Sequence, residues 1–268
     1  SGIGGLSVVR AIWAELPSED IIYVADSVNC PYGPRSQEEI ERLCFGITRF
    51  LLAQGAKAIV VACNTASAAA LLPLRAQFPD VPFIGMVPAV KPAAAWSRQH
   101  VVGVLATPIT YNGALYHDVV RDHADGVEVL SVVCPGLVEL AERGEVDSPR
   151  VRQVLLGCLT PMLDSHADAL VLGCTHYPFF RPAIEALVGE RMRVFDTGEP
   201  VARQTRHVLE SGGLLAPESR RGKSVFYSTS SAASLREVGS KLLCVDLDAY
   251  DARWSNSDLH PLAPDAPK

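Results

Sequence analysis

The segment Ala56-Lys-Ala-Ile-Val-Val-Ala-Cys63 recurs without a gap as Ala167-Asp-Ala-Leu-Val-Leu-Gly-Cys174. In each copy an apolar run ends at a cysteine, and the next two residues are polar: Asn64-Thr65 and Thr175-His176. A short apolar run that ends in this way is typical of a buried strand in a parallel sheet. We interpret the repetition as an internal duplication of one α/β unit.

Other apolar runs alternate with stretches of helical periodicity, which predicts a parallel sheet covered by helices. We expect strands at 21–25, 58–62, 101–106, 127–133, 168–173, 224–228 and 243–247. The predicted fold is α/β, with two pseudo-symmetric domains, each a mostly parallel sheet flanked by helices. Residues 1–87 with 198–250 form the first domain, residues 88–197 form the second, and residues 251–268 form an irregular tail.

The composition favours a folded protein without a nucleic-acid or membrane partner. Of 268 residues, 48% are apolar and 20% are charged, a balance that supports a packed core. The net charge is -6 and no basic run could follow a phosphate backbone, so we expect no nucleic-acid partner. No run of about 18 apolar residues and no signal-peptide pattern is present, so we expect no membrane partner and a cytoplasmic location.

Seven cysteines, none in a C-x-x-C pair, predict free thiols in a reducing compartment rather than disulfides or a four-cysteine zinc site. Cys44, Cys158 and Cys244 lie in apolar patterns, where a cysteine acts as a small buried hydrophobe. Cys30 and Cys134 each precede a proline, and we expect structural roles for them in loops.

Cys63 and Cys174 have a different setting, because each stands where a strand ends and a helix begins. Unpaired N–H groups and the helix dipole lower a thiol pKa at such a position. The duplication predicts that the two strand ends face each other across a cleft, where open sheets bind ligands. His176 could act as acid or base beside Cys174, but a Cys-x-His pair offers too few ligands for a tetrahedral metal, so we expect no metal.

Four motifs in order carry a resemblance to a known family: Ser1-Gly-Ile-Gly-Gly-Leu6, Tyr32-Gly-Pro-Arg-Ser36, Ala62-Cys-Asn-Thr-Ala-Ser67 and Gly173-Cys-Thr-His-Tyr-Pro178. From residue 1 to about residue 247 the chain resembles glutamate racemase. The resemblance implies a cofactor-independent enzyme that interconverts L- and D-glutamate, the D form being needed for bacterial peptidoglycan. Its partner is the small-molecule substrate, and we expect a homodimer.

The resemblance also implies roles for particular residues. Cys63 would take the proton from D-glutamate and Cys174 from L-glutamate, and the other cysteine would protonate the opposite face. Glu142 would support His176. Substrate contacts are implied for Ser1, Tyr32, Gly33, Asn64, Thr65, Thr175 and His176. The family's first motif begins with an aspartate one position before Ser1, and we expect such a residue in the full protein.

Three alternatives stay open at this point. Related racemases or isomerases of aspartate share the opposed cysteines, although the Tyr32-Gly33 and Cys174-Thr-His-Tyr motifs favour glutamate. A thiol hydrolase or transferase could use Cys174 as nucleophile and His176 as base, which would leave Cys63 idle. A two-domain binding protein for a small acidic ligand would need neither thiol.

Overall fold

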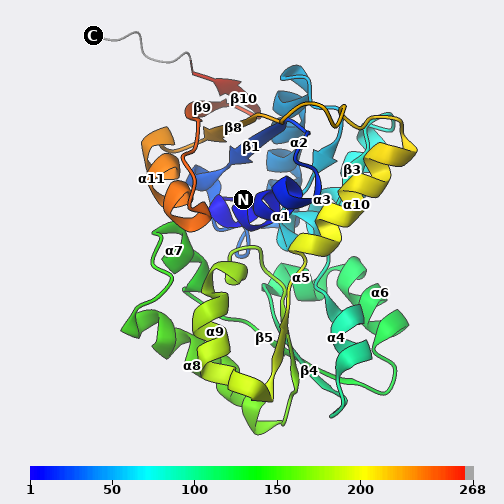
Figure 1. Ribbon diagram of the computed structural model, residues 1–268, viewed down its shortest axis with the longest axis vertical. Helices are drawn as coiled ribbons and strands as arrows, with labels where there is room; N and C mark the ends of the chain where they lie inside the picture. The colour runs from blue at the N-terminus through cyan, green and yellow to red at the C-terminus, as the bar shows by residue number, and fades with distance from the viewer. Residues whose placement is uncertain (263–268) are drawn as a thin grey trace.

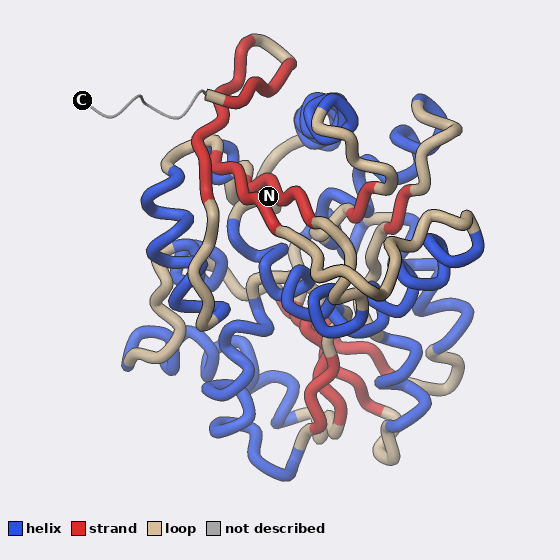
Figure 2. The backbone as a smooth tube through the Cα atoms, turned by 45° about the horizontal axis from the view of Figure 1, so that its top comes forward, coloured by secondary structure: helices blue, strands red, loops and turns tan. Residues whose placement is uncertain are grey.

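Two groups of strands, one above the other in Figure 1, organise the computed structural model, which describes residues 1–262. The upper group is the first lobe and the lower group is the second lobe. Figure 2 shows helices around both groups of strands. The α/β prediction is therefore confirmed, with two mainly parallel sheets flanked by helices.

The first lobe contains a four-stranded sheet in the order β1-β8-β9-β10 and a separate parallel pair, β2-β3. In the larger sheet β1 pairs parallel with β8 and β8 with β9, whereas β10 is antiparallel to β9. The strands are β1 (Ile21–Ala25), β2 (Ile59–Val60), β3 (Phe83–Ile84), β8 (Ser224–Ser228), β9 (Ala249–Ser255) and β10 (Asp258–Pro261). The second lobe has an entirely parallel sheet in the order β5-β4-β6-β7. Its strands are β4 (Val101–Leu105), β5 (Glu128–Val132), β6 (Ala169–Leu172) and β7 (Arg193–Phe195).

Helices cover the faces of these sheets and meet between the lobes (Figure 1). The helices of the first lobe are α1 (Leu6–Glu15), α2 (Gln37–Ala53), α3 (Asn64–Gln77), α10 (Gly198–Ser211) and α11 (Ala232–Leu243). Those of the second lobe are α4 (Val90–Trp96), α5 (Pro108–Asn112), α6 (Ala114–His123), α7 (Leu137–Glu142), α8 (Pro149–Asp164) and α9 (Arg181–Val188). Short 3-10 turns are η1 (Ile3–Gly5), η2 (Ser27–Asn29), η3 (Tyr177–Phe180) and η4 (Gly189–Arg191). Within the described residues, no helix combines the length and the apolar character needed to span a bilayer.

Local sequence signals explain where the site-forming elements begin. Ser36 and Glu39 form the predicted capping box at the start of α2, so two otherwise unpaired N–H groups are satisfied.

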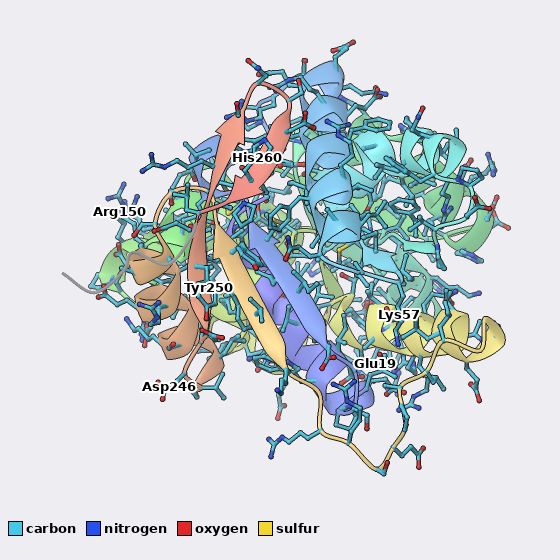
Figure 3. The ribbon with its side chains drawn as sticks, turned by 90° about the horizontal axis from the view of Figure 1, so that it is seen from above. Glu19, Lys57, Arg150, Asp246, Tyr250 and His260 are labelled. Carbon is cyan, nitrogen blue, oxygen red and sulfur yellow. A yellow bond between two sulfur atoms is a disulfide. The ribbon has the colours of Figure 1, made fainter. Side chains whose placement is uncertain are left out.

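An ion pair connects the segments that lead into β1 and β2. The Lys57 ammonium, just before β2, lies 2.7 Å from the Glu19 carboxylate, which precedes β1 (Figure 3). This ion pair links the segment before the β2-β3 pair to the segment before the larger sheet of the first lobe.

The prediction for the last part of the chain is wrong. Residues 243–247 do not form a strand, because α11 continues to Leu243 and the final strands are β9 and β10. Leu243, at a helix end, and Leu247, in a loop, belong to the same apolar cluster as Phe226 of β8, so their apolar character reflects burial rather than a strand. The predicted irregular tail is therefore ordered over 251–261, and residues 263–268 lie outside the described part. Cys244 is exposed, not a buried hydrophobe.

The prediction of free thiols is wrong for one pair, because Cys134 and Cys158 form a disulfide. Cys134 follows β5 and Cys158 lies on α8, and both belong to the core of the second lobe. Packing of α8 brings these residues to a Cα–Cα distance of 5.6 Å across 24 positions of sequence. Such a pairing depends on tertiary contact and cannot be deduced from cysteine spacing alone.

Candidate active site

Cys63 and Cys174 line one cavity of about 280 Å³ between the lobes. Cys63 follows β2 in the first lobe and Cys174 follows β6 in the second, as the duplicated segments predict. The helix predicted to begin at each cysteine is present only at Cys63, because Cys174 is followed by the 3-10 turn η3 and α9 begins at Arg181. Both side chains are almost buried, with 8% and 9% of their surface exposed. The residues of the predicted site that line this cavity are Ser1, Tyr32, Gly33, Cys63, Thr65, Cys174 and His176.

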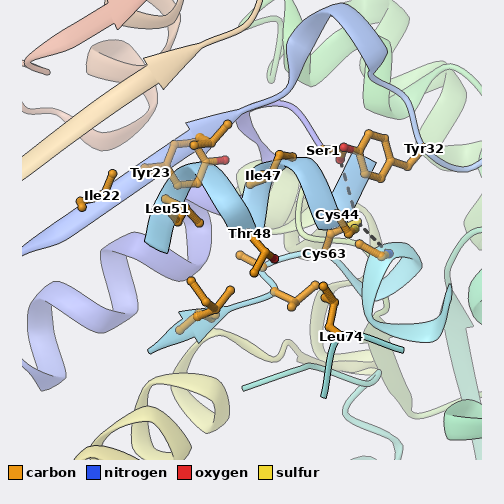
Figure 4. Close-up of a pocket in the computed structure, with 16 residues that line it drawn as sticks. Ser1, Ile22, Tyr23, Tyr32, Cys44, Ile47, Thr48, Leu51, Cys63 and Leu74 are labelled. Carbon is orange, nitrogen blue, oxygen red and sulfur yellow. Dashed lines mark hydrogen bonds between the residues drawn. The ribbon is translucent and has the colours of Figure 1, made fainter. Parts of the chain in front are cut away.

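Cys63 is the N-cap of α3, and this position gives its sulfur a donor. The Ala66 N–H donates to Cys63 Sγ at 3.4 Å, and Ser1 Oγ lies 3.9 Å from the same sulfur (dashed lines in Figure 4). Figure 4 also shows Cys44 and Tyr32 beside Cys63, on a second cavity of about 110 Å³. Cys63 therefore lines both this mostly apolar cavity and the cavity that it shares with Cys174, as do Ser1 and Tyr32.

Three groups beside the Cys63 sulfur favour its thiolate form. Burial raises the pKa of this thiol, whereas the Ala66 N–H, His176 and the Ser1 hydroxyl lower it by stabilising the thiolate. Cys44 is the contrast, because burial raises its pKa to about 12. Cys63 is thus suited to proton transfer, and Cys44 is an inert part of the core, as its apolar pattern predicts.

A chain of polar contacts leads from Cys174 into the second lobe. Cys174 Sγ lies 3.7 Å from His176 Nδ1, and His176 Nε2 lies 2.6 Å from Glu142 Oε1. Glu142 is the last residue of α7, and its Oε1 also accepts the Ile3 N–H at 2.7 Å. The structure therefore places Glu142 against His176, where the resemblance predicts it, although Glu142 does not line the cavity.

The electrostatics of this pair favour an imidazolium beside a carboxylate. Burial alone would lower the pKa of His176, but hydrogen bonds with Cys174, Cys30 and Glu142 raise it well above the usual histidine value. Burial would raise the pKa of Glu142, whereas His176 and the Ile3 N–H lower it below the usual range. The imidazolium can stabilise a thiolate at Cys174 across the 3.7 Å contact.

Backbone of the amino-terminal segment packs directly against this pair. A Cβ added at Gly2 would lie 2.0 Å from Glu142 Oε1, and one added at Gly4 would lie 2.4 Å from His176 Nδ1. Only glycine permits such a close approach at these two positions. The glycine-rich first motif therefore positions Glu142 and His176.

The resemblance predicts substrate contacts at Asn64, Thr65 and Thr175, and of these only Thr65 is among the residues that line the cavity. Thr65 lines it, and its Oγ1 lies 2.8 Å from Thr107 Oγ1 at the start of α5, which links the two lobes. Asn64 is buried, and neither its Oδ1 nor its Nδ2 has a partner among the described residues. Thr175 is buried, and its carbonyl accepts the Ser7 hydroxyl at 2.8 Å. An unpartnered buried amide beside Cys63 is suited to holding a polar ligand.

The sequence reasoning missed Asp26, which organises the first lobe's side of the cavity. This fully buried carboxylate accepts the Tyr32 hydroxyl at 2.7 Å, the Thr229 hydroxyl at 2.9 Å and the Trp254 indole N–H at 2.8 Å. The sequence feature that could have identified Asp26 is its position directly after strand β1, where a polar side chain reaches the edge of the sheet. The Tyr32 hydroxyl therefore donates to Asp26, so Tyr32 contributes mainly its ring to the cavity wall.

Comparisons with known proteins agree with this geometry. Residues 5–205 match the family Asp/Glu/Hydantoin racemase. A glutamate racemase of Roseiflexus sp. (strain RS-1) is 49% identical over 215 residues, which are 80% of this chain and 79% of the relative. A glutamate racemase isoform from Bacillus anthracis superimposes with a TM-score of 0.85 at 32% identity and covers 96% of both chains. A Francisella tularensis glutamate racemase in complex with D-glutamate gives a TM-score of 0.80 at 31% identity, over 95% of both chains.

Proposed function

Since this chain belongs to the glutamate racemases of the Asp/Glu/hydantoin racemase family, we propose that Cys63 and Cys174 are the acid and base with which it racemises glutamate. The chain interconverts L- and D-glutamate, the reaction of the family. Among the alternatives left open by the sequence, the similarity to glutamate racemases selects the glutamate racemase. Its product D-glutamate gives it the cell-wall role of that family.

The observation that carries the proposed mechanism is that two thiols from duplicated strand ends line one cavity. Inversion at Cα needs a base on one face and an acid on the other, because a single group tends to return the proton where it came from. One sulfur, as thiolate, takes the Cα proton, and the bonding electron pair moves into the α-carboxylate. The second sulfur, as thiol, gives its proton to the other face, so the two cysteines exchange protonation states in each turnover.

The developing charge on the α-carboxylate needs fixed donors. The unpartnered Asn64 amide and the Thr65 hydroxyl lie at the start of α3, where unpaired N–H groups and the helix dipole also favour an anion. Thr175, together with Ser1, Tyr32 and Gly33, would complete the substrate contacts. We assign the α-carboxylate to the α3 side because the unpartnered buried amide is there.

His176 and Glu142 would serve Cys174 in this scheme. The imidazolium stabilises the thiolate form of Cys174 in the direction that starts from L-glutamate, and Glu142 holds the imidazole in place. Cys63 takes the proton from D-glutamate, with the Ala66 N–H stabilising its thiolate.

The test is turnover of L-glutamate by purified protein in D2O without added cofactor, followed by circular dichroism and by deuterium entry at Cα. The parent is expected to lose optical activity and to incorporate deuterium, whereas Cys63→Ser and Cys174→Ser are both expected to fail. Cys244→Ser, which removes an exposed thiol, is the matched control and keeps full activity. Racemisation by either catalytic-cysteine variant at the parent rate would contradict the proposal.

Three further predictions accompany this function. The homodimer is checked by sedimentation equilibrium, and the cytoplasmic location by cell fractionation. The predicted division into residues 1–87 with 198–250 and residues 88–197 is supported by the pairing of β8 with β1. Limited proteolysis between the two parts would test it.

A further inference from the structure

Three potential metal ligands, Cys30, Glu142 and His176, come together from three separate segments of the chain. Cys30 follows η2 in the first lobe, Glu142 ends α7, and His176 precedes η3 in the second lobe. One potential ligand atom from each of the three residues lies within 4.8 Å of the other two. Cys30 and Glu142 thus supply the ligands that the Cys174-x-His176 pair lacks in the sequence.

Two of the three distances between ligand atoms lie within about 0.7 Å of those in a tetrahedral zinc site. Bond lengths of about 2.0–2.3 Å place neighbouring ligand atoms of tetrahedral Zn²⁺ roughly 3.3–3.6 Å apart. Cys30 Sγ is already 3.4 Å from Glu142 Oε1. The 2.6 Å separation of His176 Nε2 from Glu142 Oε1 would have to widen by about 0.7 Å as a metal replaces the proton between them.

The donor types and charges also suit a borderline-soft dication. A thiolate, a carboxylate and a neutral imidazole together balance the charge of Zn²⁺, so a bound ion would leave no net charge in a mostly buried site. Binding would release the thiol proton of Cys30 and the proton shared by His176 and Glu142 to solvent. Cys30 is half-buried rather than enclosed, which gives an ion a route to the cluster.

Occupation of this site would stop proton transfer. His176 Nδ1 faces Cys174 while Nε2 points to Glu142. A metal on Nε2 would therefore remove the imidazolium that stabilises the Cys174 thiolate. It would also tie Cys30 of the first lobe to Glu142 and His176 of the second, which restrains opening of the cavity between them.

We propose that Cys30, Glu142 and His176 form an inhibitory binding site for Zn²⁺ or a similar thiophilic divalent cation. The inhibition rests on the proposed function of the two cysteines, whereas metal binding at the three ligands does not. The two experiments below separate these parts.

The first experiment measures binding without using activity. Cobalt(II) is added to the Cys63→Ser/Cys174→Ser double variant, which lacks both thiols of the cavity, and the thiolate-to-cobalt charge-transfer band is recorded. The band is expected in the double variant and is expected to disappear when Cys30→Ser is added. A band that survives in the triple variant, or is missing from the correctly folded double variant, overturns the site.

The second experiment measures inhibition of the active chain by zinc chloride. Cys30→Ser keeps a hydroxyl that can donate to Glu142, so enough activity should remain to measure the inhibition curve. Its half-inhibitory Zn²⁺ concentration is expected to rise at least about tenfold, since even loss of a residue outside the ligand set weakens metal sites by this factor. Cys244→Ser is the control and should match the parent. Equal sensitivity of Cys30→Ser and the parent would place the inhibitory metal on Cys63 and Cys174 and contradict the proposal.

Discussion

His176 Nε2 lies 2.6 Å from Glu142 Oε1, although 34 positions of sequence separate the two residues. The contact joins the end of α7 to the segment after β6, which carries Cys174. The amino-terminal segment packs against both partners through Ile3, Gly2 and Gly4. The first lobe, through its amino-terminal segment, and the second lobe therefore both position His176 and Glu142 beside the Cys174 thiol.

Glu142→Gln should lower kcat by about 10–100-fold with little change in KM, because His176 loses a charge-assisted hydrogen bond worth about 1.5–3 kcal/mol. The amide keeps the shape of the carboxylate but no longer stabilises the His176 imidazolium. Steady-state kinetics in both directions check this, and Glu199→Gln, at a highly exposed position, is the control. A parent-like kcat for Glu142→Gln would remove Glu142 from the mechanism.

Gly4→Ala should reduce kcat while the chain stays folded. The new Cβ would lie 2.4 Å from His176 Nδ1, and the buried ring would have to move away from Cys174. Gly157→Ala is the matched control, because it lies in α8 with open space around its Cβ. The control should keep activity and gain up to about 1 kcal/mol of stability, since alanine is the better helix former. Equal activity of the two variants would show that the close approach does not position His176.

The sequence was sufficient to predict the site wherever local signals and the duplication agreed. Both cysteines stand at strand ends that the apolar runs predict, and Ser36 caps α2 as its motif predicts. The Cys134–Cys158 disulfide and the role of Asp26 depend on contacts between distant segments, which no local pattern contains. The strand predicted at 243–247 failed because apolar residues at a helix end and in a loop resemble a short buried strand.

Tyr32→Phe should destabilise the chain by about 1–3 kcal/mol, because the buried Asp26 carboxylate loses a donor at 2.7 Å while its burial is unchanged. Chemical denaturation measures the difference in the free energy of unfolding. Tyr250→Phe, at a less buried position on β9, provides the comparison and should cost less. A Tyr32→Phe variant as stable as the parent would show that this hydrogen bond contributes nothing net.

Asp168→Asn should lower stability at neutral pH by about 1 kcal/mol, a modest figure because the carboxylate is half-exposed. Burial tends to raise the pKa of Asp168, but the Ser97 hydroxyl and the N–H groups of Arg98 and Gln99 lower it below the usual value.

A folded-state pKa below the unfolded one means that this stabilisation is complete above the unfolded value, about pH 4, and is lost as the pH falls through the folded value. The difference between parent and variant, measured by denaturation at several pH values, should therefore shrink below about pH 4. A parent-to-variant difference that stays constant into the acid range would contradict the assignment.

The two-thiol mechanism is tested most directly by where solvent deuterium first appears. L-Glutamate is incubated with the protein in D2O, the reaction is stopped at a small extent of conversion, and the enantiomers are separated for mass spectrometry. If Cys174 removes the proton and Cys63 delivers a deuteron to the other face, the D-glutamate carries deuterium at Cα and the recovered L-glutamate carries almost none. Substrate-derived hydrogen in the D-glutamate, or equal deuterium in both enantiomers from the earliest times, would show that one group serves both faces and would contradict the account.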